Sequence, residues 1–188
     1  MFDTGTRENG GVGNYNWLRL TVASSASTPY GGTPVALPGT VQAERFDEGG
    51  PDVAYVDTTS GNGGGQYRTT DVDIESTTDL GGGYNVGRTR PGEWLKYSVT
   101  VASAGTYALD VRVANIGTGA RCRVEIDGID RTGLLSVPNT GGWQIWQTVT
   151  TTGVSLTAGP HVIRLVFETG TVENGGVGNY NWVRLVAN

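Results

Sequence analysis

Apolar and polar residues alternate along most of the second half of the chain. In the segment 106–115 (TYALDVRVAN), four apolar side chains share one face: Tyr107, Leu109, Val111 and Val113. The residues between them are small or charged. A period of two residues is typical of a β-strand with one buried face and one wet face. The pattern therefore predicts a half-buried antiparallel strand.

Further segments share this strand character, and no long stretch shows the apolar period of a helix. Loops are expected at 47–65, 79–83 and 141–142, where many of the 31 glycines lie. Cys122, the only cysteine, alternates with Val124 and Ile126 and is expected to be buried. Many short strands with glycine-rich turns predict an all-β, two-sheet β-sandwich with jelly-roll topology. The expected strands are 14–22, 41–46, 66–75, 94–101, 106–115, 121–127, 143–156, 161–169 and 179–187.

One segment occurs twice. Phe2–Leu20 and Phe167–Leu185 are identical at 16 of 19 positions. Only the second copy follows a stretch long enough to form a domain. We expect residues 1–22 to be the C-terminal strand fragment of a preceding sister module, 23–39 to be a linker and 40–188 to be the complete β-sandwich domain. Tandem modules commonly raise avidity for a multivalent partner.

Charge and residue content exclude several function classes. The net charge is −5 without a basic run, which argues against a nucleic-acid partner. No apolar run reaches the roughly 20 residues that span a membrane. The only histidine, His161, follows a turn and is expected to be structural, so no Ser/His/Asp triad or Cys/His zinc site is expected. A carboxylate pair of a glycoside hydrolase remains a less favoured alternative.

Three tryptophans are candidates for ligand contact. Trp94 falls in the polar phase of its strand, so it is expected on the solvent side. Trp143 follows Gly141–Gly142 at a loop edge, and Trp146 is the more core-like of this neighbouring pair. A rigid, flat indole offers a large contact area at low entropic cost, and a sugar ring has an apolar face that such a ring can cover.

Oxygen donors at two strands form a weak candidate cation site. Gln42 and Glu44 are two residues apart, as are Asn179 and Asn181, so each pair is expected to point to one side. Calcium prefers carboxylate, amide and carbonyl oxygens. The same spacing is also common at ordinary polar strand edges.

Taken in order, several motifs resemble the family 6 carbohydrate-binding modules over residues 40–188. They are VQAERF, GGGYNVG followed by GEWLKYSV, AGTYALDVRVA, PNTGGWQIWQTV, LTAGPHVIRLVF and NYNWVRL. Residues 2–22 resemble the end of a second copy. The resemblance implies a β-jelly roll, no catalysis, a structural calcium ion and attachment to secreted enzymes that degrade polysaccharides. It therefore implies an extracellular protein whose partner is a polysaccharide or oligosaccharide.

The resemblance also implies roles for single residues. Trp143 would be the main sugar-stacking platform, Asn179 would bond a sugar hydroxyl, and Glu75 would line the same cleft. Trp94 would serve a second cleft on a sheet face. Gln42, Glu44 and Asn181 match the calcium ligands.

One position departs from the family pattern. Where the family usually has Tyr or Trp as the second wall of the cleft, this chain has Arg88. Tyr84, Tyr55 or Tyr67 are candidates to supply the missing wall. A guanidinium suits carboxylate or sulfate, so we hypothesise a preference for an anionic glycan. The alternative is that Arg88 points into solvent or pairs with Glu93.

The sequence as a whole predicts a non-catalytic module that binds β-glucan, xylan or an anionic β-linked glycan. The rival interpretations are a calcium-stabilised structural or adhesive repeat of a cell-surface protein and, less favoured, a glycoside hydrolase or lyase.

Overall fold

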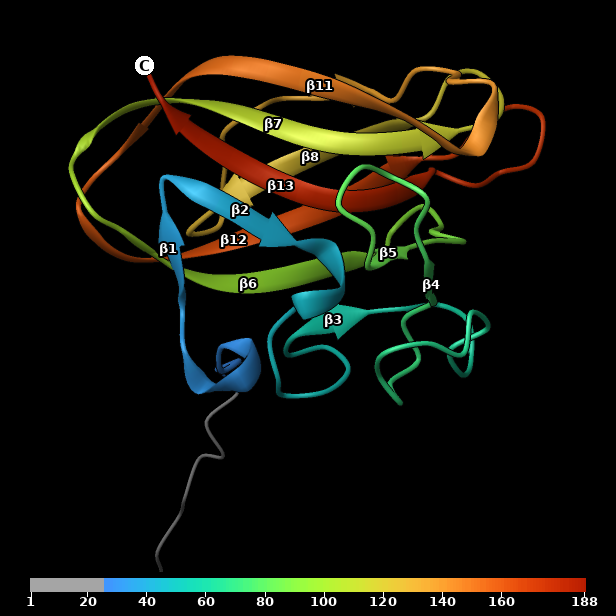
Figure 1. Cartoon of the computed structure of the whole chain (residues 1–188), viewed down its shortest axis with the longest axis horizontal. Coiled ribbons are helices and arrows are strands. Elements are labelled where there is room, and N and C mark those ends of the chain that lie inside the picture. The colour runs from blue at the N-terminus through green and yellow to red at the C-terminus, as the bar shows by residue number, and fades with distance from the viewer. Residues whose placement is uncertain (1–25) are drawn as a thin grey trace, which may run out of the picture.

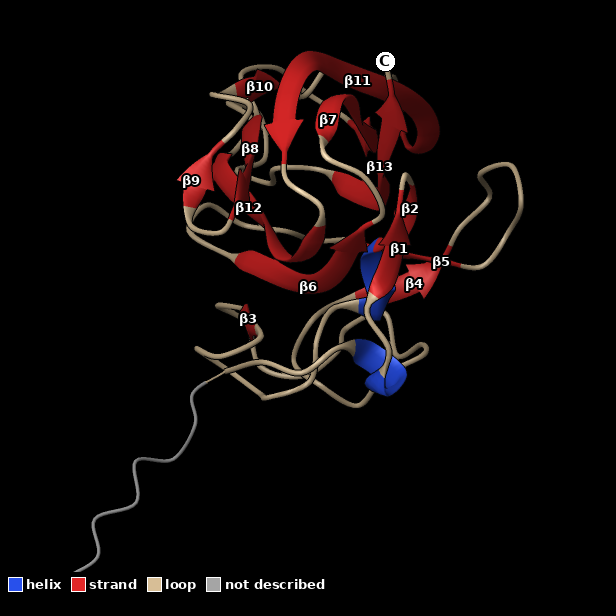
Figure 2. Ribbon diagram, turned by 90° about the vertical axis from the view of Figure 1, so that its left-hand side faces the viewer, coloured by secondary structure: helices blue, strands red, loops and turns tan. Residues whose placement is uncertain are grey.

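The computed structural model describes residues 26–188, which form two β-sheets packed face to face (Figures 1 and 2). The first sheet has seven strands. Five are ordered β1-β6-β12-β8-β10, β3 also pairs with β6, and β9 also pairs with β8. The second has six, ordered β11-β7-β13-β5-β4, with β2 paired to β13. The predicted all-β sandwich is confirmed, and the two 3₁₀ helices, η1 (Tyr30–Gly32) and η2 (Ala43–Arg45), are single short turns.

The strand bounds follow the alternating segments closely in the second half of the chain. The seven-stranded sheet contains β1 (Val35–Leu37), β3 (Tyr55–Val56), β6 (Trp94–Val101), β8 (Arg121–Ile126), β9 (Ile129–Asp130), β10 (Leu135–Ser136) and β12 (Gly159–Thr169). The six-stranded sheet contains β2 (Gly39–Gln42), β4 (Ile74–Ser76), β5 (Tyr84–Val86), β7 (Gly105–Asn115), β11 (Gly142–Leu156) and β13 (Asn179–Ala187).

The core lies between the sheets and contains the apolar phase of each long strand. Leu109 and Val111 of β7 have no exposed surface, and the Phe167 and Tyr180 rings meet with their centroids 4.7 Å apart. Cys122 is buried as predicted, and burial raises the pKa of its thiol to about 12. Buried apolar area is the main stabilising contribution of such a sandwich.

His161 has a structural partner, as the sequence predicts. Its Nδ1 atom lies 2.6 Å from Asp127 Oδ2, and Asp127 Oδ1 accepts the Val162 N–H. These contacts join the turn after β8 to the beginning of β12. Burial of His161 opposes its protonation, but the hydrogen bonds to Asp127 and to the Thr157 carbonyl and the charge of Asp127 together raise its pKa.

Four sequence predictions differ from the structure or fall outside it. Only Val41 and Gln42 of the strand expected over 41–46 lie in β2, and Ala43–Arg45 forms η2 instead. The second half of the predicted 23–39 linker is part of the sandwich, because β1 pairs in parallel with β6 and buries Leu37. Prolines at 34 and 38 suggested a linker, but they flank an edge strand, where proline is tolerated. The strand expected over 66–75 is mostly loop, since only Ile74–Ser76 forms β4. The strand and repeat copy expected at 1–22 lie outside the described residues.

The closing strand has a central position in its sheet. β13 pairs with β7 on one side and with β2 and β5 on the other. A register shift between Tyr180 and Trp182 marks a bulge at Asn181. The beginnings of β11 and β13 and the short β4–β5 pair meet at one end of the sandwich, on the right in Figure 1. The loops that join there build the candidate site.

Candidate functional site

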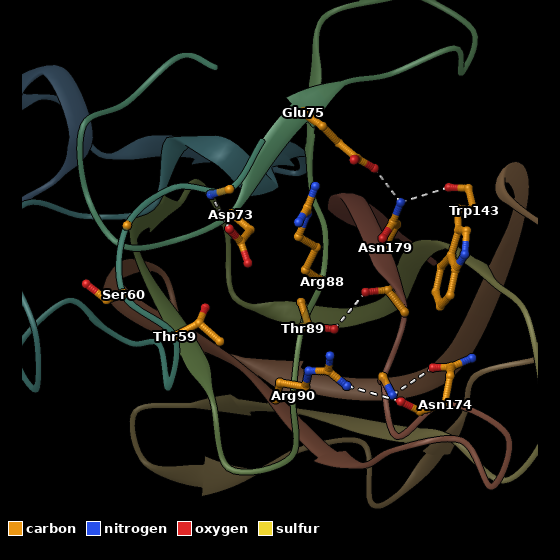
Figure 3. Close-up of a pocket in the computed structure, with 14 residues that line it drawn as sticks. Thr59, Ser60, Asp73, Glu75, Arg88, Thr89, Arg90, Trp143, Asn174 and Asn179 are labelled. Carbon is orange, nitrogen blue, oxygen red and sulfur yellow. Dashed lines mark hydrogen bonds between the residues drawn. The ribbon is translucent and has the colours of Figure 1, made fainter. Parts of the chain in front are cut away.

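A hollow of about 590 Å³ opens at this end of the sandwich. It brings together four residues that the sequence analysis singled out, Glu75, Arg88, Trp143 and Asn179 (Figure 3). They come from β4, from the segment after β5, and from the first residues of β11 and β13. No sequence pattern pointed to the remaining lining side chains, which are Thr59, Ser60, Asp73, Thr89, Arg90 and Asn174.

Trp143 forms one side of the hollow. It follows Gly141, whose φ of 89° suits glycine, and it is the second residue of the edge strand β11. Its side chain is 37% exposed, and the ring faces the hollow in Figure 3. An exposed indole at an edge strand provides a flat apolar surface for a ligand.

Glu75 and Asn179 form a fixed polar group beside the indole. Asn179 Nδ2 donates to Glu75 Oε1 at 2.7 Å and to the Trp143 carbonyl at 2.8 Å. Glu75 Oε1 also accepts from Gln144 Nε2 at 3.2 Å. Both amide hydrogens of Asn179 are thus engaged, whereas Asn179 Oδ1 and Glu75 Oε2 take part in no hydrogen bond among the described residues. These two oxygens can accept hydroxyl protons.

Gly87 allows this arrangement. A Cβ atom at this position would lie 3.1 Å from Asn179 Oδ1 and 3.2 Å from Glu75 Oε1. Glycine therefore leaves the space that the two side chains occupy.

Arg88 lies near the middle of the hollow (Figure 3). It is exposed and forms no hydrogen bond or ion pair with the described residues. The predicted alternative pairing with Glu93 is wrong, because Glu93 accepts from the Thr58 N–H and hydroxyl and from the Arg90 N–H instead.

None of the three tyrosines supplies a second aromatic wall, so the predicted site role of Tyr84 is wrong. Tyr84 is half-buried and packs on Tyr67, which packs in turn on Tyr30, with centroid distances of 4.9 and 5.8 Å. Tyr55 is buried against Phe46. Successive residues of a strand point to opposite faces, so Tyr84 points away from its neighbour Asn85, which bonds Glu75.

The far wall of the hollow is the loop 59–63. Asn62 Oδ1 accepts the backbone N–H groups of Gly64 and Ile74, and Thr58 is tied to Glu93. Side-chain to backbone bonds of this kind fix an irregular loop in place of a strand. The only sequence signal was the run of Gly, Asn, Ser and Thr residues, which indicates a loop without indicating where it lies.

Comparison with known proteins agrees with this geometry. A family model described as "Carbohydrate binding module (family 6)" matches residues 65–187. The chain belongs to carbohydrate-binding module family 6. The Clotting factor G alpha subunit of Tachypleus tridentatus is 31% identical to this module over 121 residues, which make up 63% of the chain but only 17% of that relative.

Solved structures of family 6 modules share the fold of this module. A β-1,3-glucan-binding module from Bacillus halodurans matches with a TM-score of 0.61 and 31% identity over 82% of this chain and 100% of that one. A module of a Cellvibrio mixtus lichenase in complex with cellotriose matches with a TM-score of 0.58 and 32% identity, covering 80% of this chain and 98% of that one.

The other three tryptophans of the described residues, Trp94, Trp146 and Trp182, do not line this hollow. Trp94 is half-buried on the outer face of the seven-stranded sheet, as the alternation predicts. Lys96 Nζ and the Arg164 guanidinium lie 5.1 and 5.5 Å from its ring centroid. These cations already contact the ring that a second cleft would present. Trp146 is half-buried, and its Nε1 atom is buried without a partner.

The residues of the predicted cation site lie on packed elements. Gln42 pairs with Trp182, and Gln42 and Asn181 line one small hollow of about 270 Å³. Glu44 belongs to η2, which packs against β13. Glu44 Oε2 and Asn181 Oδ1 are both buried without a hydrogen-bond partner. Burial raises the pKa of Glu44 to about 7, against smaller lowering effects of a backbone hydrogen bond and Arg45.

No group of three His, Cys, Asp or Glu side chains that could hold a metal occurs among residues 26–188. A cation here would therefore depend on amide oxygens in addition to the Glu44 carboxylate. In the same range, no helix has the length and apolar character needed to cross a membrane.

Proposed function

We propose that this module binds a β-linked glucan in the Trp143 hollow without cleaving it. The observation that carries the proposal is the exposed Trp143 indole beside two oxygens, Asn179 Oδ1 and Glu75 Oε2, that accept no hydrogen bond from residues 26–188. Two similar structures, each more than 30% identical, are a β-1,3-glucan-binding module and a module holding cellotriose. Both descriptions support a β-glucan as the first ligand to test.

The binding mechanism combines one apolar and one polar contact. The apolar face of a pyranose lies on the Trp143 ring, while two of its hydroxyl groups donate to Asn179 Oδ1 and Glu75 Oε2. Each such bond replaces one to water, so its net contribution is small. We expect single-site dissociation constants in the millimolar to micromolar range, about −4 to −8 kcal/mol.

We also propose a structural calcium ion held by Gln42, Glu44 and Asn181. The support is two buried oxygens without hydrogen-bond partners, Glu44 Oε2 and Asn181 Oδ1, because a buried polar atom without a hydrogen bond is costly. Calcium would supply a positive charge and several oxygen contacts that tie η2 to β13. These residues are not among those that line the Trp143 hollow, so the ion would act on stability and not on sugar contact.

Native electrophoresis of the chain through gels that contain laminarin, barley β-glucan or xylan tests the proposed function. We expect retarded migration in at least one β-glucan gel and unchanged migration in a gel without polysaccharide. A reducing-sugar assay on the same samples should show no release. Unchanged migration in every polysaccharide gel would favour the structural or adhesive repeat, and sugar release would favour the hydrolase.

The Asp73 and Glu75 carboxylates are the reason to include that assay, because both line the hollow. Asp73 Oδ1 accepts the Gly63 N–H, and Glu75 Oε1 accepts three side-chain amide bonds. We assign Asp73 to a positioning role, in which it orients the loop, and Glu75 to holding Asn179 and accepting a sugar hydroxyl, with no acid–base role for either. An extracellular location and further modules in the parent protein remain predictions from the family resemblance.

A further inference from the structure

We propose that Arg88 recognises an oxyanion on the bound glycan, either the carboxylate of a uronic acid or a sulfate ester. The inference rests on the proposed function, since it concerns the same hollow, and it adds a substrate class to it. Four observations support it: the ion pairs of the other arginines, the backbone conformation of Arg88, the position of its side chain and the charged residues around it.

Most arginines of the described chain are neutralised by carboxylates, and Arg88 is not. Arg112 bonds Asp79, Arg164 bonds Glu125 and Arg184 bonds Asp110, each with at least one nitrogen–oxygen distance of 2.7 Å or less. Arg68 and Arg123 are paired in the same way with Glu48 and Glu125. Arg88 has no such partner although Asp73 and Glu75 line the same hollow. Its donors are therefore free for a ligand.

The backbone of Arg88 is held in an unusual conformation. Its φ is 53°, in the left-handed region that few residues other than glycine adopt. Such a conformation costs free energy and persists where the surrounding structure imposes it, which is common at binding sites. On each side the chain is fixed: the Gly87 N–H donates to the Asp73 carbonyl, and the Thr89 hydroxyl donates to the Gly178 carbonyl at 2.7 Å.

The Arg88 guanidinium packs against a defined surface. A Cβ atom at Gly63 would lie 3.2 Å from Arg88 Nη1 and 3.4 Å from Cζ, so the guanidinium packs on the bare Gly63 backbone. The Gly63 N–H in turn donates to Asp73 Oδ1. An arginine that rests against a fixed surface loses less side-chain entropy when it binds, and its planar fork suits the two oxygens of a carboxylate or sulfate.

Acidic and basic side chains both line the hollow. Glu75 stands beside Asn179 and Trp143, where neutral hydroxyls are the suitable partners. Arg90 lies next to Arg88 in the lining and uses one nitrogen for the Asn174 carbonyl, at 3.1 Å. Arg88 packs against Gly63 of the 59–63 loop, near Asp73, and Arg90 lies toward Asn174 (Figure 3). An acidic substituent fits beside the Arg88 guanidinium, on a sugar whose ring lies toward Trp143.

Calorimetric titration with three matched sets of β-linked oligosaccharides tests the proposal: a neutral set, a set with a uronic acid and a set with a sulfate ester. For the wild-type chain we expect at least one acidic set to bind about tenfold more tightly than the neutral set, a gain that added salt reduces. Arg88→Gln should remove that preference, because it weakens binding of the acidic set far more than binding of the neutral set. Arg88→Lys, which keeps the charge without the planar fork, should retain part of it.

The matched control is Arg121→Gln, which removes the same charge from an exposed arginine of β8 outside the hollow and should leave the preference intact. The acidic set that binds more tightly than the neutral set shows whether the oxyanion is a carboxylate or a sulfate. Equal or tighter binding of the neutral set by the wild type overturns this inference while the proposed function stands. Equal losses for neutral and acidic sugars in Arg88→Gln also overturn it. Binding of no set at all would remove the proposed function as well.

Discussion

Replacing Trp143 with alanine is expected to weaken β-glucan binding by roughly 30- to 150-fold, which corresponds to about 2 to 3 kcal/mol for the loss of one buried aromatic face. The indole is 37% exposed and stands at the beginning of an edge strand, so its removal should leave the fold intact. Isothermal titration calorimetry of both chains with the same oligosaccharide measures the effect, and a thermal melt checks the fold.

Ile145→Ala is the matched control for this experiment. Ile145 lies two residues further along the same strand, is 53% exposed and does not line the hollow. Its replacement should leave affinity unchanged.

Trp94→Ala distinguishes the hollow from the outer sheet face as the binding site. If it abolishes binding and Trp143→Ala does not, the ligand sits on the outer face of the seven-stranded sheet and the assignment to the hollow is wrong.

Chelation of calcium is expected to lower the melting temperature of the chain by about 5 to 10 °C. An ion present at about 100 times its dissociation constant stabilises the folded state by about 2.7 kcal/mol, and about 1 kcal/mol shifts the midpoint of a chain of this size by roughly 2 to 4 °C. Calorimetric melts in calcium and in chelator measure the difference. Sugar affinity in calcium should match that of the untreated chain.

Glu44→Gln should make the melting temperature insensitive to calcium, because it removes the charged ligand whose Oε2 atom is buried without a partner. Glu48→Gln makes the same change at a half-exposed carboxylate that pairs with Arg68 and should keep the calcium response. Melts that coincide in calcium and in chelator for the wild type would refute the metal assignment.

Alternation predicted the strands that provide the core and one wall of the site. Tyr107, Leu109 and Val111 are buried where the period of two places them, and Trp143 is displayed where a double glycine precedes a strand. Asn179 and Glu75 meet although 104 residues separate them, and this contact followed only from the family resemblance. Local pattern carries no information about such distant pairs.

The conformation of the 59–63 loop could not be predicted from the sequence, because side-chain to backbone hydrogen bonds hold it. Asn62 organises the 59–63 wall through the N–H groups of Gly64 and Ile74, a contact that composition does not reveal. β1 was missed for a different reason: prolines flank it, and its pairing with β6 is a long-range backbone contact that the local sequence does not reveal. Tyr84 was misassigned because the strand phase around it was not fixed by a long alternating run. Arg88 could be recognised as unusual, but its lack of partners is visible only in three dimensions.

The most direct test of sugar binding at the Trp143 hollow is a nuclear magnetic resonance titration of the ¹⁵N-labelled chain with a laminari-oligosaccharide. We expect the indole N–H signal of Trp143 and the side-chain amide signals of Asn179 to shift progressively and saturate together, while the indole signal of Trp94 stays in place. Saturable shifts confined to Trp94 and its neighbours, with Trp143 and Asn179 unmoved, would contradict it.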